Sequence, residues 1–113
     1  MPSWASNVAR ADIDEIVRDG PEEDDAPPTD QAITACTGVS YLIDLEPQRG
    51  LRVVVFSTGD GGLNLIIDRP DGEARLSFHF GSNGRIVCKR VFVSGCDVFP
   101  WWPLDEQFKW LRA

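Results

Sequence analysis

Apolar and polar residues alternate along much of the chain, a period of two that is typical of β-strands with one buried face. The alternation is clearest over residues 73–80, where one face holds Ala74, Leu76, Phe78 and Phe80 and the other holds Glu73, Arg75, Ser77 and His79. Weaker alternation or short apolar runs predict further strands over residues 39–46, 51–57, 63–68 and 85–93. Because short turns rich in glycine and proline join these segments, consecutive strands should run antiparallel. The pattern predicts an antiparallel meander of about five strands.

A helix is predicted near the N-terminus. Asp12 and Glu15 have the spacing of a capping box ahead of an apolar stripe, and Gly20-Pro21 should end the helix. The helix begins at Asp12 or extends back to Trp4.

The C-terminal segment has the helical period as well. Leu104, Phe108 and Leu111 repeat at i, i+4 and i+7 and predict a terminal helix packed on the sheet. We expect it to cover the side of the sheet that carries residues 54, 56 and 66.

Residues 29–38 allow two interpretations. Thr29 could cap a short helix that runs through Cys36 and ends at Gly38, or the first strand could begin near Ile33. The helix is favoured, because the apolar residues here do not alternate cleanly with polar ones.

These elements predict the α+β class, with an N-terminal and a C-terminal helix packed on the sheet. The 113 residues suffice for one ordinary domain. The net charge of −7 is distributed unevenly, since residues 1–30 hold nine acids and two bases whereas residues 31–113 hold nine of each. We therefore divide the chain into an acidic N-terminal helix and linker arm (1–30) and a single α+β domain (31–113).

The acids of the arm bear on possible partners. They should repel phosphate groups, which argues against nucleic-acid binding, and could attract a basic protein; the alternative is a plain solubilising linker. The acids that we expect at such an interface are Asp19, Glu22, Glu23, Asp24 and Asp25. No secretory signal opens the chain, and the apolar run over residues 53–56 is too short to span a bilayer. We expect a bacterial cytoplasmic protein with reduced thiols and no membrane partner.

No set of residues has the spacing of a catalytic or metal site. His79 is the only histidine, and Ser77 two residues away on the same strand face lies about 7 Å from it, too far for a Ser–His dyad. Cys36, Cys88 and Cys96 lack the close pairs of structural zinc sites. The sequence predicts no catalysis, no metal and no cofactor.

Tryptophans gather near the C-terminus. Trp101, Trp102 and Trp110 are three of the four in the chain. Packing of the terminal helix accounts for part of this cluster, but two consecutive tryptophans flanked by prolines cannot easily both point inward. Because tryptophan is common among interface hot spots, we expect at least one of them on a partner-binding surface.

Residues 94–108 read SGCDVFPWWPLDEQF. This stretch resembles the ending of some bacterial immunity proteins of polymorphic toxin systems, which pass from a strand through a glycine and a Phe-Pro step into a short terminal helix. The resemblance covers only this C-terminal stretch. It implies a cytoplasmic inhibitor that binds a cognate toxin and does no chemistry.

The leading hypothesis is a non-enzymatic protein-binding module, such as an immunity or antitoxin-like inhibitor, that uses the tryptophan cluster and the acids of the arm. The alternative is a small-molecule-binding domain or a minor enzyme that uses the polar strand face of Glu73, Arg75, Ser77 and His79. A homodimer is compatible with either hypothesis.

Overall fold

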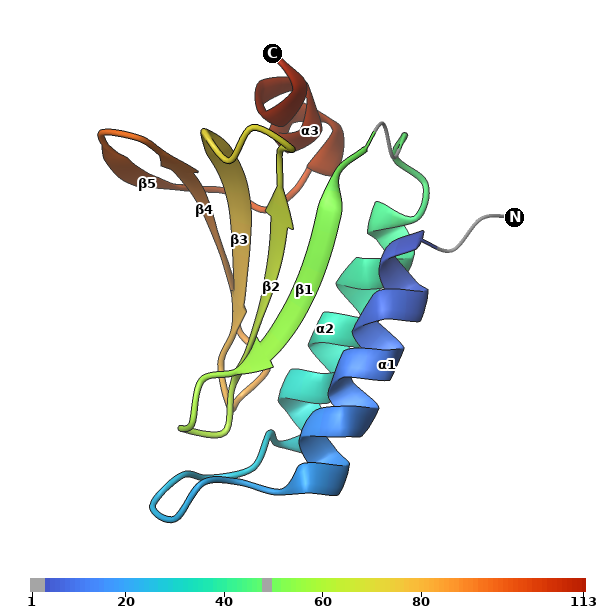
Figure 1. Ribbon diagram of the computed structural model, residues 1–113, viewed down its shortest axis with the longest axis vertical. Coiled ribbons are helices and arrows are strands. Elements are labelled where there is room, and N and C mark those ends of the chain that lie inside the picture. The colour runs from blue at the N-terminus through green and yellow to red at the C-terminus, as the bar shows by residue number, and fades with distance from the viewer. Residues whose placement is uncertain (1–3, 48–49) are drawn as a thin grey trace.

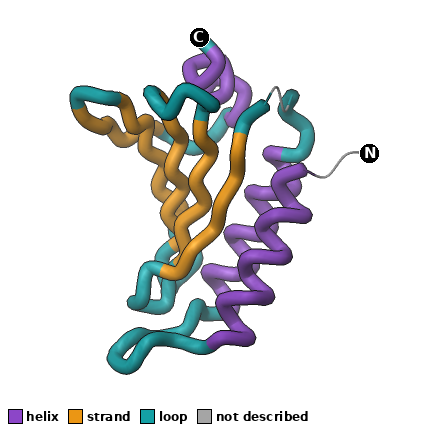
Figure 2. Tube along the Cα trace, viewed as in Figure 1, coloured by secondary structure: helices purple, strands orange, loops and turns teal. Residues whose placement is uncertain are grey.

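The computed structural model describes residues 4–47 and 50–113 and confirms the predicted α+β class (Figures 1 and 2). One five-stranded sheet has the order β1-β2-β3-β4-β5, and every neighbouring pair is antiparallel, so the sheet is a meander. The elements in chain order are α1 (Trp4–Asp19), α2 (Asp30–Ile43), β1 (Arg52–Ser57), β2 (Leu63–Asp68), β3 (Ala74–Phe80), β4 (Ile86–Phe92), β5 (Gly95–Phe99) and α3 (Leu104–Arg112).

The hydrophobic core lies between one face of the sheet and the helices. The register aligns Val55, Leu65, Phe78 and Cys88 across β1 to β4, and each of these side chains is buried. Since successive side chains of a strand point to opposite faces, the residues between them belong to the other side of the sheet. Figure 1 shows α1 and α2 as a helical hairpin alongside the sheet.

Helix α3 packs on the same face of the sheet as α1 and α2. Phe108 is fully buried in the common core, and its ring meets Trp4 of α1 edge-on, with 6.5 Å between ring centroids. The expectation that α3 covers the side of Val54, Phe56 and Ile66 is therefore wrong. Its apolar stripe was predicted correctly, but a stripe does not say which sheet face receives it.

The predicted strand over residues 39–46 is also wrong, because most of this segment is the C-terminal half of α2. The buried residues of α2 include Ala32, Cys36, Val39 and Ile43, which share one face of a helix, whereas Leu45 is 73% exposed. Gly38 lies inside the helix and does not end it. The fifth strand of the sheet is instead β5, in a segment for which no strand was predicted.

Two contacts made by Thr29 fix the start of α2. Its hydroxyl oxygen accepts the N–H of Ala32 at 3.1 Å, and the hydroxyl donates to the carbonyl of Ser82 at 2.6 Å. The helical interpretation of residues 29–38, with Thr29 as the N-cap, is thereby confirmed.

Helix α1 extends to Trp4, well before the predicted capping box. Asp44, at the end of α2, accepts the N–H groups of Ala5 and Ser6 at 2.7 and 3.0 Å, so the acceptor at the start of α1 comes from a residue far along the chain. Asp12 does not cap the helix but accepts the backbone N–H of Val55 in β1 at 2.9 Å.

Residues on both sides of position 30 share one core. Ala5, Ala9 and Ile13 of α1 are buried in the same cluster as the side chains of the sheet. The acidic segment between α1 and α2 is exposed, but it is held at its end, where the N–H groups of Ala26 and Thr29 donate to the carbonyls of Gly59 and Gly61. Figure 2 shows this loop beside the loop that joins β1 and β2. Among the described helices, none combines the length and the apolar character needed to cross a membrane.

Candidate protein-binding surface

The face of the sheet that turns away from the three helices carries a row of side chains contributed by all five strands. Cross-strand pairing aligns Val54, Ile66, Ser77, Lys89 and Val98 in this row. Val54 is 44% exposed and Val98 is 66% exposed, and Phe56 in the adjacent row is 44% exposed. We call this side the open face. Its exposed large apolar residues lie on the two edge strands, β1 and β5, whereas Ile66 on β2 is buried.

Two pairs of polar residues on the open face contact each other across β2 and β3. Nδ1 of His79 lies 2.9 Å from Oδ1 of Asn64, and Nε of Arg75 lies 2.9 Å from Oδ1 of Asp68. These pairs join β3 to β2. The exposed apolar side chains Val54, Phe56 and Val98 are the part of the open face that water solvates poorly.

The structure brings together three of the four residues that were predicted to form a ligand site. Arg75, Ser77 and His79 share the open face of β3, with Arg75 and His79 already bonded to β2. Glu73 precedes the strand, and its carboxylate lies 3.9 Å from Arg69 at the end of the sheet. A small-molecule site on this face stays a prediction.

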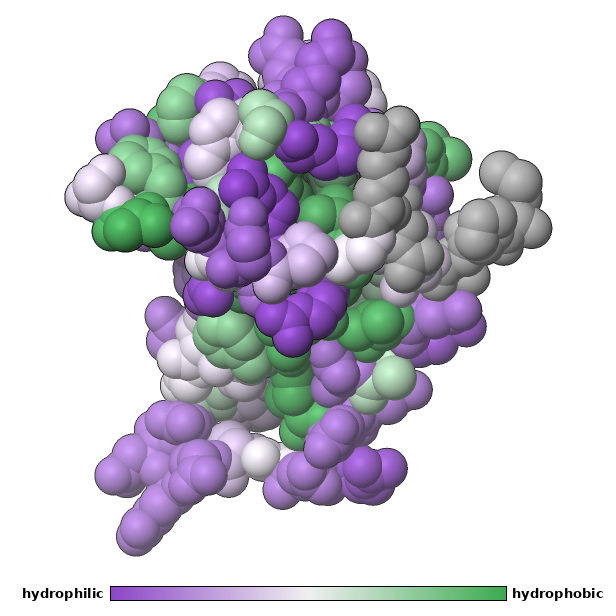
Figure 3. All heavy atoms as spheres, turned by 45° about the horizontal axis from the view of Figure 1, so that its top comes forward, coloured by the Kyte–Doolittle hydropathy of each residue, from purple (hydrophilic) through white to green (hydrophobic). Residues whose placement is uncertain are grey.

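Strand β5 forms one edge of the sheet. It pairs with β4 on one side, and four of its five residues are exposed. Val93 in the β4–β5 turn is 85% exposed. Figure 3 shows hydrophobic surface over this hairpin, at the left of the view. The sequence prediction missed β5, although the dipeptide Ser94-Gly95 directly after an apolar strand is a recognised turn signal.

The tryptophans form a second apolar corner. Trp101 and Trp102 meet at 5.6 Å between ring centroids; Trp102 is 57% exposed, whereas Trp101 and Trp110 are half-buried against the core. Trp102 lines a hollow of about 210 Å³ with Leu42 and Leu45, at the end of α2. The cluster therefore divides into one exposed ring and two packing rings.

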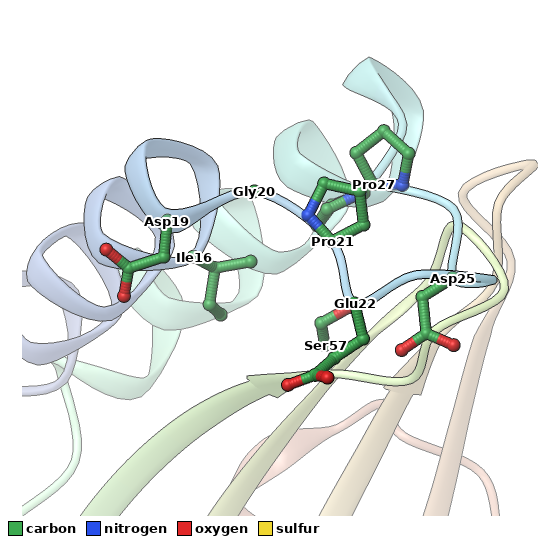
Figure 4. A pocket seen from close by; sticks show the side chains of 9 residues that line it. Ile16, Asp19, Gly20, Pro21, Glu22, Asp25, Pro27 and Ser57 are labelled. Carbon is green, nitrogen blue, oxygen red and sulfur yellow. The ribbon is translucent and has the colours of Figure 1, made fainter.

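The acids of the predicted arm lie at the opposite end of the helical hairpin. Asp19, Glu22 and Asp25 line a pocket of about 270 Å³ with Ser57 at the end of β1 (Figure 4). Glu23 and Asp24 are exposed on the same loop. At the start of α1, the indole N–H of Trp4 donates to the carbonyl of Glu46, and Glu46 also lines the Trp102 hollow. Since the 16 residues of α1 rise about 24 Å, the acids and the exposed tryptophan do not form one continuous surface.

The three thiols differ in their surroundings. Burial raises the pKa of Cys36 to about 12, with the negative charge of Asp12 adding to the effect, and burial raises the pKa of Cys88 to about 11. Cys96 is exposed on the edge strand β5. Among the described residues, no cluster of histidine, cysteine, aspartate or glutamate could hold a metal ion.

Comparison of the chain with protein-family models, with curated proteins and with solved structures finds no match in any of the three. We therefore infer the function from the surface of the molecule.

Proposed function

We propose that this chain is a non-enzymatic protein-binding module whose partner covers the open face of the sheet. The observation that carries the proposal is the placement of all three helices on one face, which leaves Val54, Phe56 and Val98 exposed on the other. A sheet with one layer of helices normally presents polar residues to water on its second face. Large apolar residues that break this pattern indicate a surface that another molecule covers.

A protein suits this surface better than a small ligand does. The open face is a broad array of side chains aligned across five strands, and two of its polar pairs, His79 with Asn64 and Arg75 with Asp68, already contact each other. Small ligands generally bind in concave sites where a few polar groups converge. A protein surface can cover scattered apolar residues and bury them together, which is how interface cores form.

The resemblance of residues 94–108 to immunity proteins is compatible with this function, since such an inhibitor acts by binding. The stretch includes β5 and the start of α3, so it forms one margin of the sheet. On this proposal the partner is a toxin-like protein, and Trp102 provides a second contact if the partner reaches around the end of α2.

The test is affinity purification from the native host with the wild-type chain and with a double variant, Val54→Ser/Phe56→Ser. We expect the wild type to retain a specific protein and the variant to bind it at least tenfold more weakly, because truncating a side chain at the desolvated centre of an interface costs about 2 kcal/mol or more, and about 1.4 kcal/mol is a tenfold change in Kd. Val17→Ser is the matched control, since Val17 is an apolar residue of α1 that is 57% exposed.

Hydrogen exchange of the recovered complex then locates the contact. Protection of amides in β1 and β5 supports the proposal. If the double variant retains the same proteins as the wild type with the same affinity, or if no protein distinguishes the wild type from it, the open face is not the binding surface.

A further inference from the structure

The two edge strands of the sheet, β1 and β5, differ in the contacts that their outer sides make. At the β1 edge, α1 packs against the strand, and Asp12 accepts the N–H of Val55 at 2.9 Å, so a backbone group that could pair with another strand is already bonded. At the β5 edge, the strand pairs only with β4, and its residues 95–98 are exposed. An unpaired edge of this kind is a template for another strand.

Asp97 is the charged residue of β5. Its cross-strand neighbour is Arg90, but Nε of Arg90 donates to Oε1 of Gln107 at 2.8 Å, and its guanidinium lies 3.9 Å above the ring of Phe99. Arg90 is thus held toward α3. Within the described part of the chain, no ion pair includes Asp97, which is exposed on the edge strand.

A second copy of the chain fits this edge poorly. Two copies of β5 that pair antiparallel and use all five residues must be centred on Asp97, which places the two Asp97 carboxylates directly opposite each other. Like charges in opposed positions destabilise strand pairing. A strand with a base at the central position would reverse this effect.

We propose that β5 accepts an extended segment of a partner protein as a sixth strand, and that this segment carries a lysine or arginine opposite Asp97 between two apolar residues. Because side chains alternate, the base would lie on the helix side of the sheet with Asp97, and its two neighbours would lie beside Cys96 and Val98 on the open face. The added apolar residues extend the row that ends at Val98.

This inference rests on the proposed function, since it gives part of the same partner its position and chemistry.

The first test uses two capped synthetic peptides of about eight residues, in which valine alternates with lysine or with glutamate. Binding is followed by the amide resonances of the intact chain. We expect the lysine peptide to shift and protect the amides of β5 and to bind about tenfold more tightly than the glutamate peptide.

Charge reversal separates pairing at β5 from general attraction to an acidic protein. Asp97→Lys should invert the preference, so that the glutamate peptide binds more tightly. Asp14→Lys, an equal charge change at an exposed position of α1, should leave the lysine peptide preferred. Absence of binding, shifts confined to the acidic loop of residues 19–25, or an unchanged preference in Asp97→Lys would each overturn the inference.

The two proposals can fail separately. If capture of the host protein depends on Val54 and Phe56 but Asp97→Lys captures it as well as the wild type, strand addition at β5 is wrong and the open-face function stands. If capture depends on Asp97 alone, β5 is the binding edge and the open face is not the binding surface.

Discussion

The acceptor that Asp44 provides to α1 allows a sharp test of how the helical hairpin is stabilised. Asp44→Ala removes the carboxylate that accepts the N–H groups of Ala5 and Ser6, residues that are 0% and 3% exposed. Neither N–H has an intrahelical acceptor, because both belong to the first turn of α1. The substitution therefore leaves two poorly solvated donors without a partner.

The expected loss follows from these two bonds. Removing a capping side chain costs about 1 kcal/mol, and a hydrogen bond to a charged group contributes about 1.5–3 kcal/mol. We expect Asp44→Ala to lower the free energy of unfolding by about 2–3 kcal/mol, which corresponds to a decrease in Tm of roughly 10 °C for a chain of this size. Asp44→Asn keeps a side-chain oxygen and should lose less than half as much.

Urea unfolding followed by circular dichroism measures these differences. Asp14→Ala is the matched control, because Asp14 is exposed on α1 and its loss removes the same charge; it should change the free energy of unfolding by less than about 0.5 kcal/mol. If Asp44→Ala unfolds at the same urea concentration as Asp14→Ala, the Asp44 carboxylate does not stabilise the start of α1.

The start of α2 and the three thiols can be tested by substitution, by labelling and by changing the pH. Thr29→Ala should lower the free energy of unfolding by about 1–2 kcal/mol in the same assay, whereas Thr29→Ser, which keeps the hydroxyl, should lose little; equal losses would contradict the capping role. Iodoacetamide at about pH 8 should label only Cys96 in the folded protein and all three cysteines in urea, because Cys36 and Cys88 are buried and their pKa values are raised to about 12 and about 11. Since these two thiols ionise near their ordinary pKa of 9.0 in the unfolded chain and only at higher pH in the fold, the free energy of unfolding should fall as pH rises from about 9 to 11; a flat profile would contradict their burial.

Residues 39–46 were predicted to form a strand, but most of them belong to helix α2. Val39, Tyr41, Ile43 and Leu45 alternate with polar residues, yet Val39 and Ile43 continue a helical stripe that begins at Ala32. Both periods fit a segment this short. Tyr41 and Leu45 are 49% and 73% exposed, so the apolar residues that suggested a strand were partly surface residues.

The candidate surface was predicted only in part. The strand phase of residues 73–80 gave the correct faces, and with them the open-face position of Arg75, Ser77 and His79. The grouping of the acidic arm with the tryptophans was a prediction from composition, and the structure places the two at opposite ends of the helical hairpin. Neither the run of acids nor the cluster of tryptophans says how far apart the two segments lie in the folded chain.

The α+β class, the antiparallel meander and the inward residues of β2 and β3 followed from the sequence pattern, because a period of two joined by short turns allows little else. The sequence also determined that the excess acid lies in the first 30 residues. Packing in three dimensions places α1, α2 and α3 on one face of the sheet, sets Asp12 against the β1 edge and, within the described residues, leaves the outer side of β5 unpaired. Periodicity describes how a segment presents its side chains, whereas the choice of face and edge depends on packing among segments far apart in the chain.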